Sequence, residues 1–194
     1  MSDIAILKQM IKEESTVSLE ECQNGRRLNY SVTLTEAKAN YFVKIDGMPK
    51  HEDVIVINPE FFNPSTVFKA SKGECKRADF VIIADDHLGK IIVCIEMKKT
   101  KGENKKIIQQ LKGAKCFIAY CQEIGHSFWQ DENFLKNYEY RFVSIKNISV
   151  AKTITRRDRQ TSKPTEINDR PDRMLRISSP SGLQFNQLVE GHKG

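Results

Sequence analysis

The stretch Arg77–Lys98, RADFVIIADDHLGKIIVCIEMK, decides the fold. Two apolar runs flank a polar segment, residues 85–90, whose Asp, His, Gly and Lys content is typical of a turn. Asp79 stands before the first run, and Glu96 and Lys98 stand at the end of the second. The stretch therefore predicts a β-hairpin with charged residues at its open end.

The register of this hairpin decides whether the charged residues meet. With residues 85–90 as the turn, pairing outward along both strands places Asp79 directly opposite Glu96, with Cβ atoms roughly 5 Å apart. Strand side chains alternate, so Glu96 and Lys98 share a face. A slip of one residue would separate them. We therefore predict that Asp79, Glu96 and Lys98 converge on one face.

The composition fits a soluble globular domain. The chain has 194 residues, of which 39% are hydrophobic and 29% charged. No apolar run approaches the roughly 20 residues of a membrane helix, and MSDIAILKQM lacks a signal-peptide pattern, so no membrane association is expected. Five cysteines without a CxxC pair indicate reduced, mostly buried thiols in a cytoplasmic protein and argue against a zinc site. The net charge of +6 is compatible with a polyanionic partner, although many such proteins bind no nucleic acid.

Apolar periodicity predicts the other elements of a mixed α/β fold. We expect a mixed central sheet flanked by helices, with a domain over residues 1–150 and an appendage of that domain over 151–194. The expected elements are helices at 3–14 and 104–124 (capped by Gly125), strands at 28–35, 39–45, 54–57 and 138–145, and a terminal hairpin of 174–177 with 183–189. Residues 152–176 hold eight Lys or Arg and four acids, which predicts a basic segment that is mobile or ordered by a partner.

Two further polar residues are expected to face inward from the helices. Helical spacing places Glu14 near the centre of the apolar stripe of the first helix, unless it is a solvated residue at a fraying end. Gln110 lies three residues after Ile107 and four before Ala114, so it faces inward near the start of the second helix. Both are candidates to approach the hairpin's open end.

Basic residues cluster after the hairpin. From Lys98 to Lys112 there are six lysines and one acid. This is either a solvated helix face or a surface that contacts phosphates. The candidates for binding a nucleic-acid backbone are Lys99, Lys101, Lys105, Lys106, Arg156, Arg157 and Arg159.

The order of elements, together with Asp79 in RADF and Glu96-Met97-Lys98 in IEMK, resembles the PD-(D/E)xK, or restriction-endonuclease-like, nuclease superfamily. The resemblance covers residues 1–148. Members add an acid from the first helix and in some cases a glutamine from the helix after the motif, to which Glu14 and Gln110 would correspond. Two departures are Ala78 in place of proline and Ala114 in place of a tyrosine. The second departure argues against the RecB-type exonuclease subgroup.

This resemblance implies a metal-dependent nuclease. Asp79 and Glu96 would repel one another unless a cation or a proton lies between them, and their hard oxygens favour Mg²⁺ or Mn²⁺. The backbone carbonyl of Met97 would be a further ligand, and Lys98 would act on the attacking water. The implied reaction is phosphodiester hydrolysis that leaves a 5′-phosphate, with DNA as the expected substrate.

The sequence also leaves partners open. A homodimer, or a partner protein that supplies target recognition, would fit a nuclease subunit in a restriction, defence or repair system. The alternative is a catalytically silent nuclease-like fold that serves as a nucleic-acid-binding or protein-assembly module.

Overall fold

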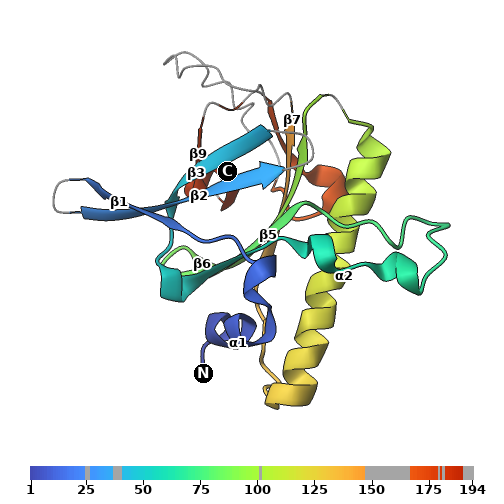
Figure 1. Ribbon diagram of the computed structural model, residues 1–194, viewed down its shortest axis with the longest axis horizontal. Helices are drawn as coiled ribbons and strands as arrows, with labels where there is room; N and C mark the ends of the chain where they lie inside the picture. The colour runs from blue at the N-terminus through green and yellow to red at the C-terminus, as the bar shows by residue number, and fades with distance from the viewer. Residues whose placement is uncertain are drawn as a thin grey trace.

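The computed structural model is a mixed α/β fold with two mixed β-sheets (Figure 1). It describes residues 1–24, 27–36, 41–100, 102–146, 167–178, 180 and 182–189.

The larger sheet has five strands. They lie in the order β4 (Val54–Ile57), β5 (Phe80–Asp86), β6 (Gly89–Lys98), β7 (Glu139–Lys146) and β8 (Leu175–Ser178). The β4–β5 and β5–β6 pairs are antiparallel, whereas β6–β7 and β7–β8 are parallel. The crossover from β6 to β7 is made by a long helix, as parallel neighbours require.

The smaller sheet has four strands, of which the first three are antiparallel. Its order is β1 (Glu20–Asn24), β2 (Arg27–Glu36), β3 (Tyr41–Met48) and β9 (Leu183–Gln184), with β9 parallel to β3. The predicted strands at 28–35 and 39–45 correspond to β2 and β3; residues 39 and 40 lie outside the described part of the chain.

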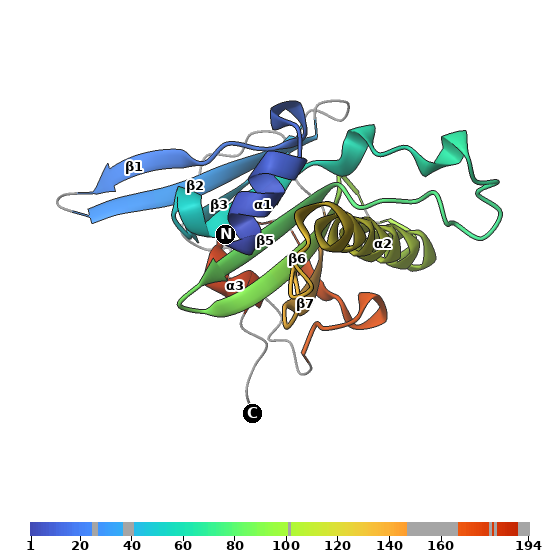
Figure 2. The ribbon, with the colours of Figure 1, turned by 90° about the horizontal axis from the view of Figure 1, so that it is seen from below.

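The five-stranded sheet is covered differently on its two faces (Figure 2). On one face, helices α1 (Asp3–Met10) and α2 (Asn104–Trp129) bury apolar residues against alternate positions of β4, β5 and β6. On the other face, the core is closed by β2, β3, β9 and the short helix α3 (Phe185–Val189). The expected helical flanking therefore holds for one face, and a second sheet covers most of the other.

Short 3₁₀ helices connect several of these elements. They are η1 (Glu13–Ser15), η2 (His51–Asp53), η3 (Pro59–Phe61), η4 (Pro64–Thr66) and η5 (Pro171–Arg173).

The hairpin has the predicted register. Phe80 pairs with Ile95 and Ala84 with Ile91. The strands continue to a pair between Asp86 and Gly89, so the turn is shorter than residues 85–90. The amide of Leu88 donates to Oδ1 of Asp86 at 2.9 Å, which closes this tight turn. Because the turn shortens equally on both sides, the pairing is unchanged.

Both predicted helix ends are wrong. The first helix stops at Met10 rather than residue 14, because Ile11 is extended while its amide still bonds the carbonyl of Leu7. The second helix continues to Trp129 instead of ending at Gly125. A Cβ at Gly125 would come within 2.0 Å of the Phe134 ring, so this glycine allows close packing rather than a cap.

The predicted terminal hairpin is also wrong. Leu175 and Ile177 are buried in β8, which runs parallel to β7 in the larger sheet. Leu183 pairs with Ile45 in the smaller sheet, and the residues after Gln184 form α3. Each segment thus buries its apolar residues against an existing sheet rather than against the other segment.

Three remaining expectations concern membrane-spanning helices, the cysteines and the basic segment. Among the described residues, no helix is long and apolar enough to cross a membrane. All five cysteines are free, but only Cys94 and Cys121 are buried. Most of the predicted basic segment, residues 152–166, lies outside the described part of the chain.

Candidate active site

The site begins where β5 starts beside the end of β6. Asp79 precedes β5, and its Oδ2 accepts a hydrogen bond of 2.7 Å from the amide of Met97. The carbonyl of Met97 accepts from the hydroxyl of Tyr41 at 3.1 Å. The amide and carbonyl of one strand residue point to the same side of the strand. The Met97 carbonyl is therefore directed toward the side on which Asp79 lies.

Glu96 is the central residue of the site. It has no exposed surface and lies on the helix-covered face, alternating with the buried Cys94. The ammonium of Lys98 forms an ion pair with its Oε1, and Lys98 is 32% exposed. Neither carboxyl oxygen of Glu96 has a hydrogen-bond partner of good geometry among the described residues, and Oε2 also lies outside the ion pair with Lys98. A carboxylate buried without full compensation is costly, so this group requires a further partner.

Gln110 joins the site from the first turns of α2. Its side-chain amide approaches Glu96 closely enough for hydrogen bonding to lower the pKa of that carboxyl. Gln110 also lines a hollow of about 320 Å³ together with Asp79. The remaining lining residues are Glu36, Asn58, Glu60, Cys75, Lys76, Arg77 and Ala78. The site is therefore reached from solvent through a mainly polar depression.

Both carboxyl groups hold their protons unusually tightly. Burial, with the charge of Asp79, raises the pKa of Glu96 from 4.5 to about 8, against the opposing effects of Lys98 and Gln110. Burial also raises the pKa of Asp79 from 3.8 to about 6, although the Met97 amide and Lys98 lower it. The two carboxyls are thus close enough to interact, and the ammonium of Lys98 does not offset the combined effect of burial and repulsion on their pKa values.

Lys98, the basic partner of Glu96, is held in its charged form. Burial lowers the pKa of Lys98, but the attraction of Glu96, Asp79 and Glu36 outweighs it, so the pKa is raised overall. Burial and the same three carboxylates raise the pKa of Tyr41 as well. Tyr41 therefore keeps its proton and remains a donor to Met97.

Three residues of this site are not predicted by the sequence. Glu36 ends β2 and Glu60 lies in η3, and their charges both raise the pKa of Asp79. Tyr41 begins β3 and reaches Met97 from the smaller sheet. No local pattern marks these residues, because Glu36 and Tyr41 approach the hairpin only when the two sheets pack, and Glu60 approaches it from the segment that follows β4. The one signal in the sequence is that the turn between two predicted strands begins at Glu36.

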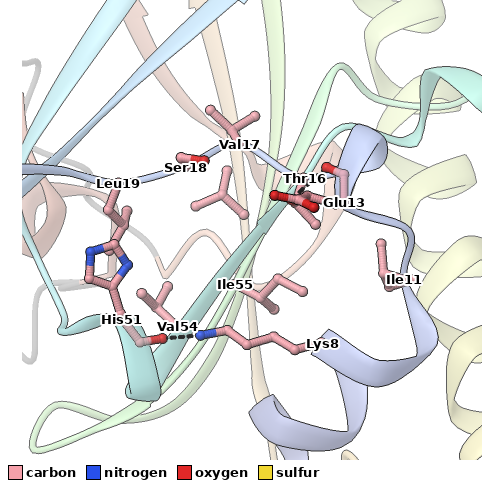
Figure 3. A pocket seen from close by; sticks show the side chains of 11 residues that line it. Lys8, Ile11, Glu13, Thr16, Val17, Ser18, Leu19, His51, Val54 and Ile55 are labelled. Carbon is pink, nitrogen blue, oxygen red and sulfur yellow. Dashed lines mark hydrogen bonds between the residues drawn. The ribbon is translucent and has the colours of Figure 1, made fainter.

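Glu14 does not take the predicted inward position. It lies in η1, where it is 66% exposed and pairs with Lys12 at 3.7 Å. Its neighbour Glu13 faces a separate hollow of about 310 Å³ beside β4 (Figure 3). Across that hollow, Lys8 donates a hydrogen bond to the carbonyl of His51. Because the helix ends four residues early, the helical spacing that would turn Glu14 inward does not apply.

The candidate backbone-binding residues have different positions. Lys99 is exposed just after β6, and Lys105 and Lys106 are exposed in the first turn of α2. Lys106 pairs with Glu103 at 3.1 Å. Lys101, Arg156, Arg157 and Arg159 lie outside the described residues.

The donor set is suited to a hard divalent cation. Within the described residues, no group of three or more His, Cys, Asp or Glu side chains is arranged to hold a metal ion. Mg²⁺, however, commonly binds through one or two carboxylates and keeps several waters. The unsatisfied Oε2 of Glu96, the carboxylate of Asp79 and the carbonyl of Met97 fit that requirement.

Comparison with known proteins does not identify relatives. No protein-family model, curated protein or solved structure matches this chain.

Proposed function

We propose that this protein is a divalent-metal-dependent nuclease of the PD-(D/E)xK type that hydrolyses phosphodiester bonds, with DNA as its expected substrate. The observation that carries the proposal is the fully buried Glu96, whose Oε2 lacks a hydrogen-bond partner of good geometry among the described residues. Asp79, Lys98 and Gln110 all act on this carboxyl. A cation bound between the two carboxylates would satisfy the free oxygen and relieve their repulsion.

The order of elements supports the same proposal. A helix is followed by strands, by the β5–β6 hairpin, by the long helix α2 and by the parallel strand β7. Asp79 and the Glu96-Met97-Lys98 segment lie at the open end of the hairpin, as the superfamily motif requires. The three-stranded unit β1–β3 is an addition between α1 and β4.

Each residue has a role that its surroundings favour. When bound, Mg²⁺ or Mn²⁺ would polarise the phosphodiester and lower the pKa of a bound water. Asp79, Glu96 and the Met97 carbonyl would hold the ion. Lys98 stays protonated beside Glu96 and is partly exposed, so it can stabilise negative charge that develops on the phosphate. Gln110 lines the hollow and would orient the water or a phosphate oxygen.

The proposal is tested by incubating the purified protein with supercoiled plasmid, linear duplex, single-stranded DNA and RNA. Mg²⁺, Mn²⁺ and EDTA are compared for each substrate. We expect cleavage that EDTA abolishes, with 5′-phosphate ends. Glu96→Gln preserves the size of the side chain and should abolish cleavage. Glu132→Gln, an exposed position outside the site, should leave it unchanged.

Two results would contradict the nuclease proposal. Cleavage by Glu96→Gln at the wild-type rate would show that this site does not catalyse the reaction. Binding of nucleic acid without cleavage in any metal would favour the catalytically silent module. The specific observation that favours the module is the ion pair between Lys98 and Glu96, which offsets part of the buried charge without a metal.

A further inference from the structure

A segment of 21 residues leaves the sheet next to the site and returns to it. We define the arm as residues 58–78, which connect the end of β4 to Asp79. Figure 2 shows the arm extending past α2, away from both sheets. It contains η3 and η4 but no strand, so neither sheet accounts for its shape.

The arm exposes large apolar side chains at positions that burial does not explain. Phe61 is 71% exposed, Val67 79% and Phe68 59%. Single exposed apolar residues are common on protein surfaces. Three within eight residues of one projecting segment indicate a binding surface.

The same segment is basic. Lys69, Lys72 and Lys76 are exposed, and Arg77 follows at the edge of the hollow. The arm has two acids against these four cations. Glu60 precedes Phe61, and Glu74 accepts hydrogen bonds from the backbone amides of residues 71 and 72 at 3.1 and 2.7 Å, so the Glu74 carboxylate stabilises the arm's own turn. The arm thus carries exposed aromatic rings in its first half and cations from Lys69 onward, and exposed rings together with cations are the features of a surface that binds nucleic-acid strands.

The arm is held in a defined shape against α2. The Phe62 ring lies 5.3 Å from that of Phe117. The side-chain amide of Gln109 donates a hydrogen bond to the backbone carbonyl of Lys72 at 3.1 Å. Gly113 allows the arm's backbone to approach the helix, since a Cβ there would lie 1.7 Å from the carbonyl oxygen of residue 76. A surface ordered before binding loses less conformational entropy when it binds.

Both ends of the arm form walls of the active-site hollow. Asn58 and Glu60 contribute from its beginning, and Lys76 and Arg77 from its end. A strand lying along the arm would therefore lead into the hollow that contains Asp79.

We propose that the arm binds an unpaired nucleic-acid strand, with Phe61 and Phe68 stacking on bases and the arm's cations contacting phosphates. This rests on the proposed nuclease function and specifies its substrate as one with a single-stranded region. Bases in a duplex are already stacked and present only edges and backbone, so exposed phenyl rings gain little from a duplex. A protein partner would not require lysines beside the exposed rings.

The test measures binding in EDTA, so that cleavage does not interfere. Fluorescence anisotropy compares single-stranded DNA, single-stranded RNA and blunt duplex DNA. We expect the full-length protein to prefer single strands. Phe61→Ala with Phe68→Ala should weaken single-strand binding at least about fivefold for each ring removed, with little change for duplex. Phe128→Ala, an exposed phenylalanine near the C-terminal end of α2, is the matched control and should change nothing.

A second variant tests the charges. Lys69→Ala with Lys72→Ala should weaken binding and reduce the dependence of log K on log salt by about 0.7 for each phosphate that the variant no longer neutralises. Wild-type binding by the aromatic double variant would overturn the proposal. Absence of single-strand binding by the parent protein would also overturn it. So would a double variant whose affinity for single strand and for duplex falls equally while its oligomeric mass changes.

The arm and the catalytic site can fail independently. Aromatic-dependent single-strand binding without cleavage in any metal would support the arm and contradict the nuclease. Metal-dependent cleavage that is unaffected by the aromatic variant on every substrate would support the nuclease and contradict the arm.

Discussion

The carboxylate of Asp79 accepts a hydrogen bond of 2.7 Å from the amide of Met97, the residue between Glu96 and Lys98. This bond joins the start of one strand to the end of the next at the point where regular pairing between β5 and β6 stops. The same side chain thus satisfies a backbone donor and brings a negative charge beside Glu96. A structural and a chemical role are combined in Asp79, and substitution can separate them.

We predict that Asp79→Asn and Asp79→Ala both abolish metal-dependent cleavage but differ in stability. Asparagine retains an oxygen that accepts from Met97, whereas alanine leaves this amide without an acceptor. Loss of that acceptor costs about 1–3 kcal/mol of unfolding free energy. Urea unfolding, followed by circular dichroism, measures the difference. Equal stability of the two variants would show that the bond is not important for folding.

A second prediction concerns pH, because the native state holds a proton on Glu96 that the unfolded chain releases. The pKa of Glu96 is about 8 in the folded protein against 4.5 when unperturbed. Between these values the native state binds more protons than the unfolded state, so stability falls as pH rises through this window. Each unit of pKa difference corresponds to about 1.4 kcal/mol.

Glu96→Gln removes this titration. Relative to wild type without metal, its unfolding free energy should therefore rise by about 2 kcal/mol or more between pH 5 and pH 8. The substitution also changes the contact between Lys98 and residue 96, so the change with pH, rather than the absolute value, is the diagnostic quantity. Glu132→Gln, at an exposed site, should follow the wild-type profile. A parallel profile for Glu96→Gln would contradict the raised pKa.

A third prediction follows for the divalent ion. Millimolar Mg²⁺ should raise the melting temperature of the wild type at pH 8, because the ion replaces the proton between Asp79 and Glu96. At pH 5 protons compete and the increase should be smaller. Glu96→Gln should show little increase at either pH. A similar increase in wild type and variant would mean that the ion binds elsewhere. Differential scanning fluorimetry provides the readout independently of cleavage.

The hairpin could be predicted because its determinants are local. Two apolar runs around a turn fix the pairing, and a one-residue slip would place Asp79 and Glu96 on opposite faces. The shorter turn at Asp86 and Gly89 preserved that pairing, so the error in turn length had no consequence. The inward position of Gln110 could also be predicted from local sequence, since Gln110 lies in a long helix with a clear apolar periodicity.

The parts of the site that the sequence does not predict depend on contacts between distant segments. Glu36 and Tyr41 reach the site because the smaller sheet packs on the larger one, which no spacing in the sequence encodes. The prediction for Glu14 was wrong for a different reason, because it relied on a local pattern. Its predicted position assumed that the helical spacing continued through Ile11, but the backbone becomes extended there.

The contact between Gly113 and the arm gives a prediction with a distinctive sign. Glycine to alanine within a helix normally stabilises a protein by roughly 0.5–1 kcal/mol. At Gly113 the added Cβ would lie 1.7 Å from the carbonyl oxygen of residue 76, so the arm must move away from α2. Gly113→Ala should therefore destabilise the protein and lower cleavage, as judged by denaturant midpoint and rate. Gly182→Ala, where a Cβ meets nothing within 4 Å, is the control.

The last prediction concerns Tyr41, which joins the two sheets at the site. Its hydroxyl donates to the carbonyl of Met97 at 3.1 Å, and its raised pKa keeps the proton in place. Tyr41→Phe removes one buried hydrogen bond and should cost about 1 kcal/mol of unfolding free energy. It also frees the carbonyl proposed to hold the metal. Because the proton of Tyr41 competes with the ion for this oxygen, the variant should need less Mg²⁺ for half-maximal cleavage. An increase in the Mg²⁺ requirement would instead show that Tyr41 orients the carbonyl, and titration of cleavage rate against Mg²⁺ distinguishes the two.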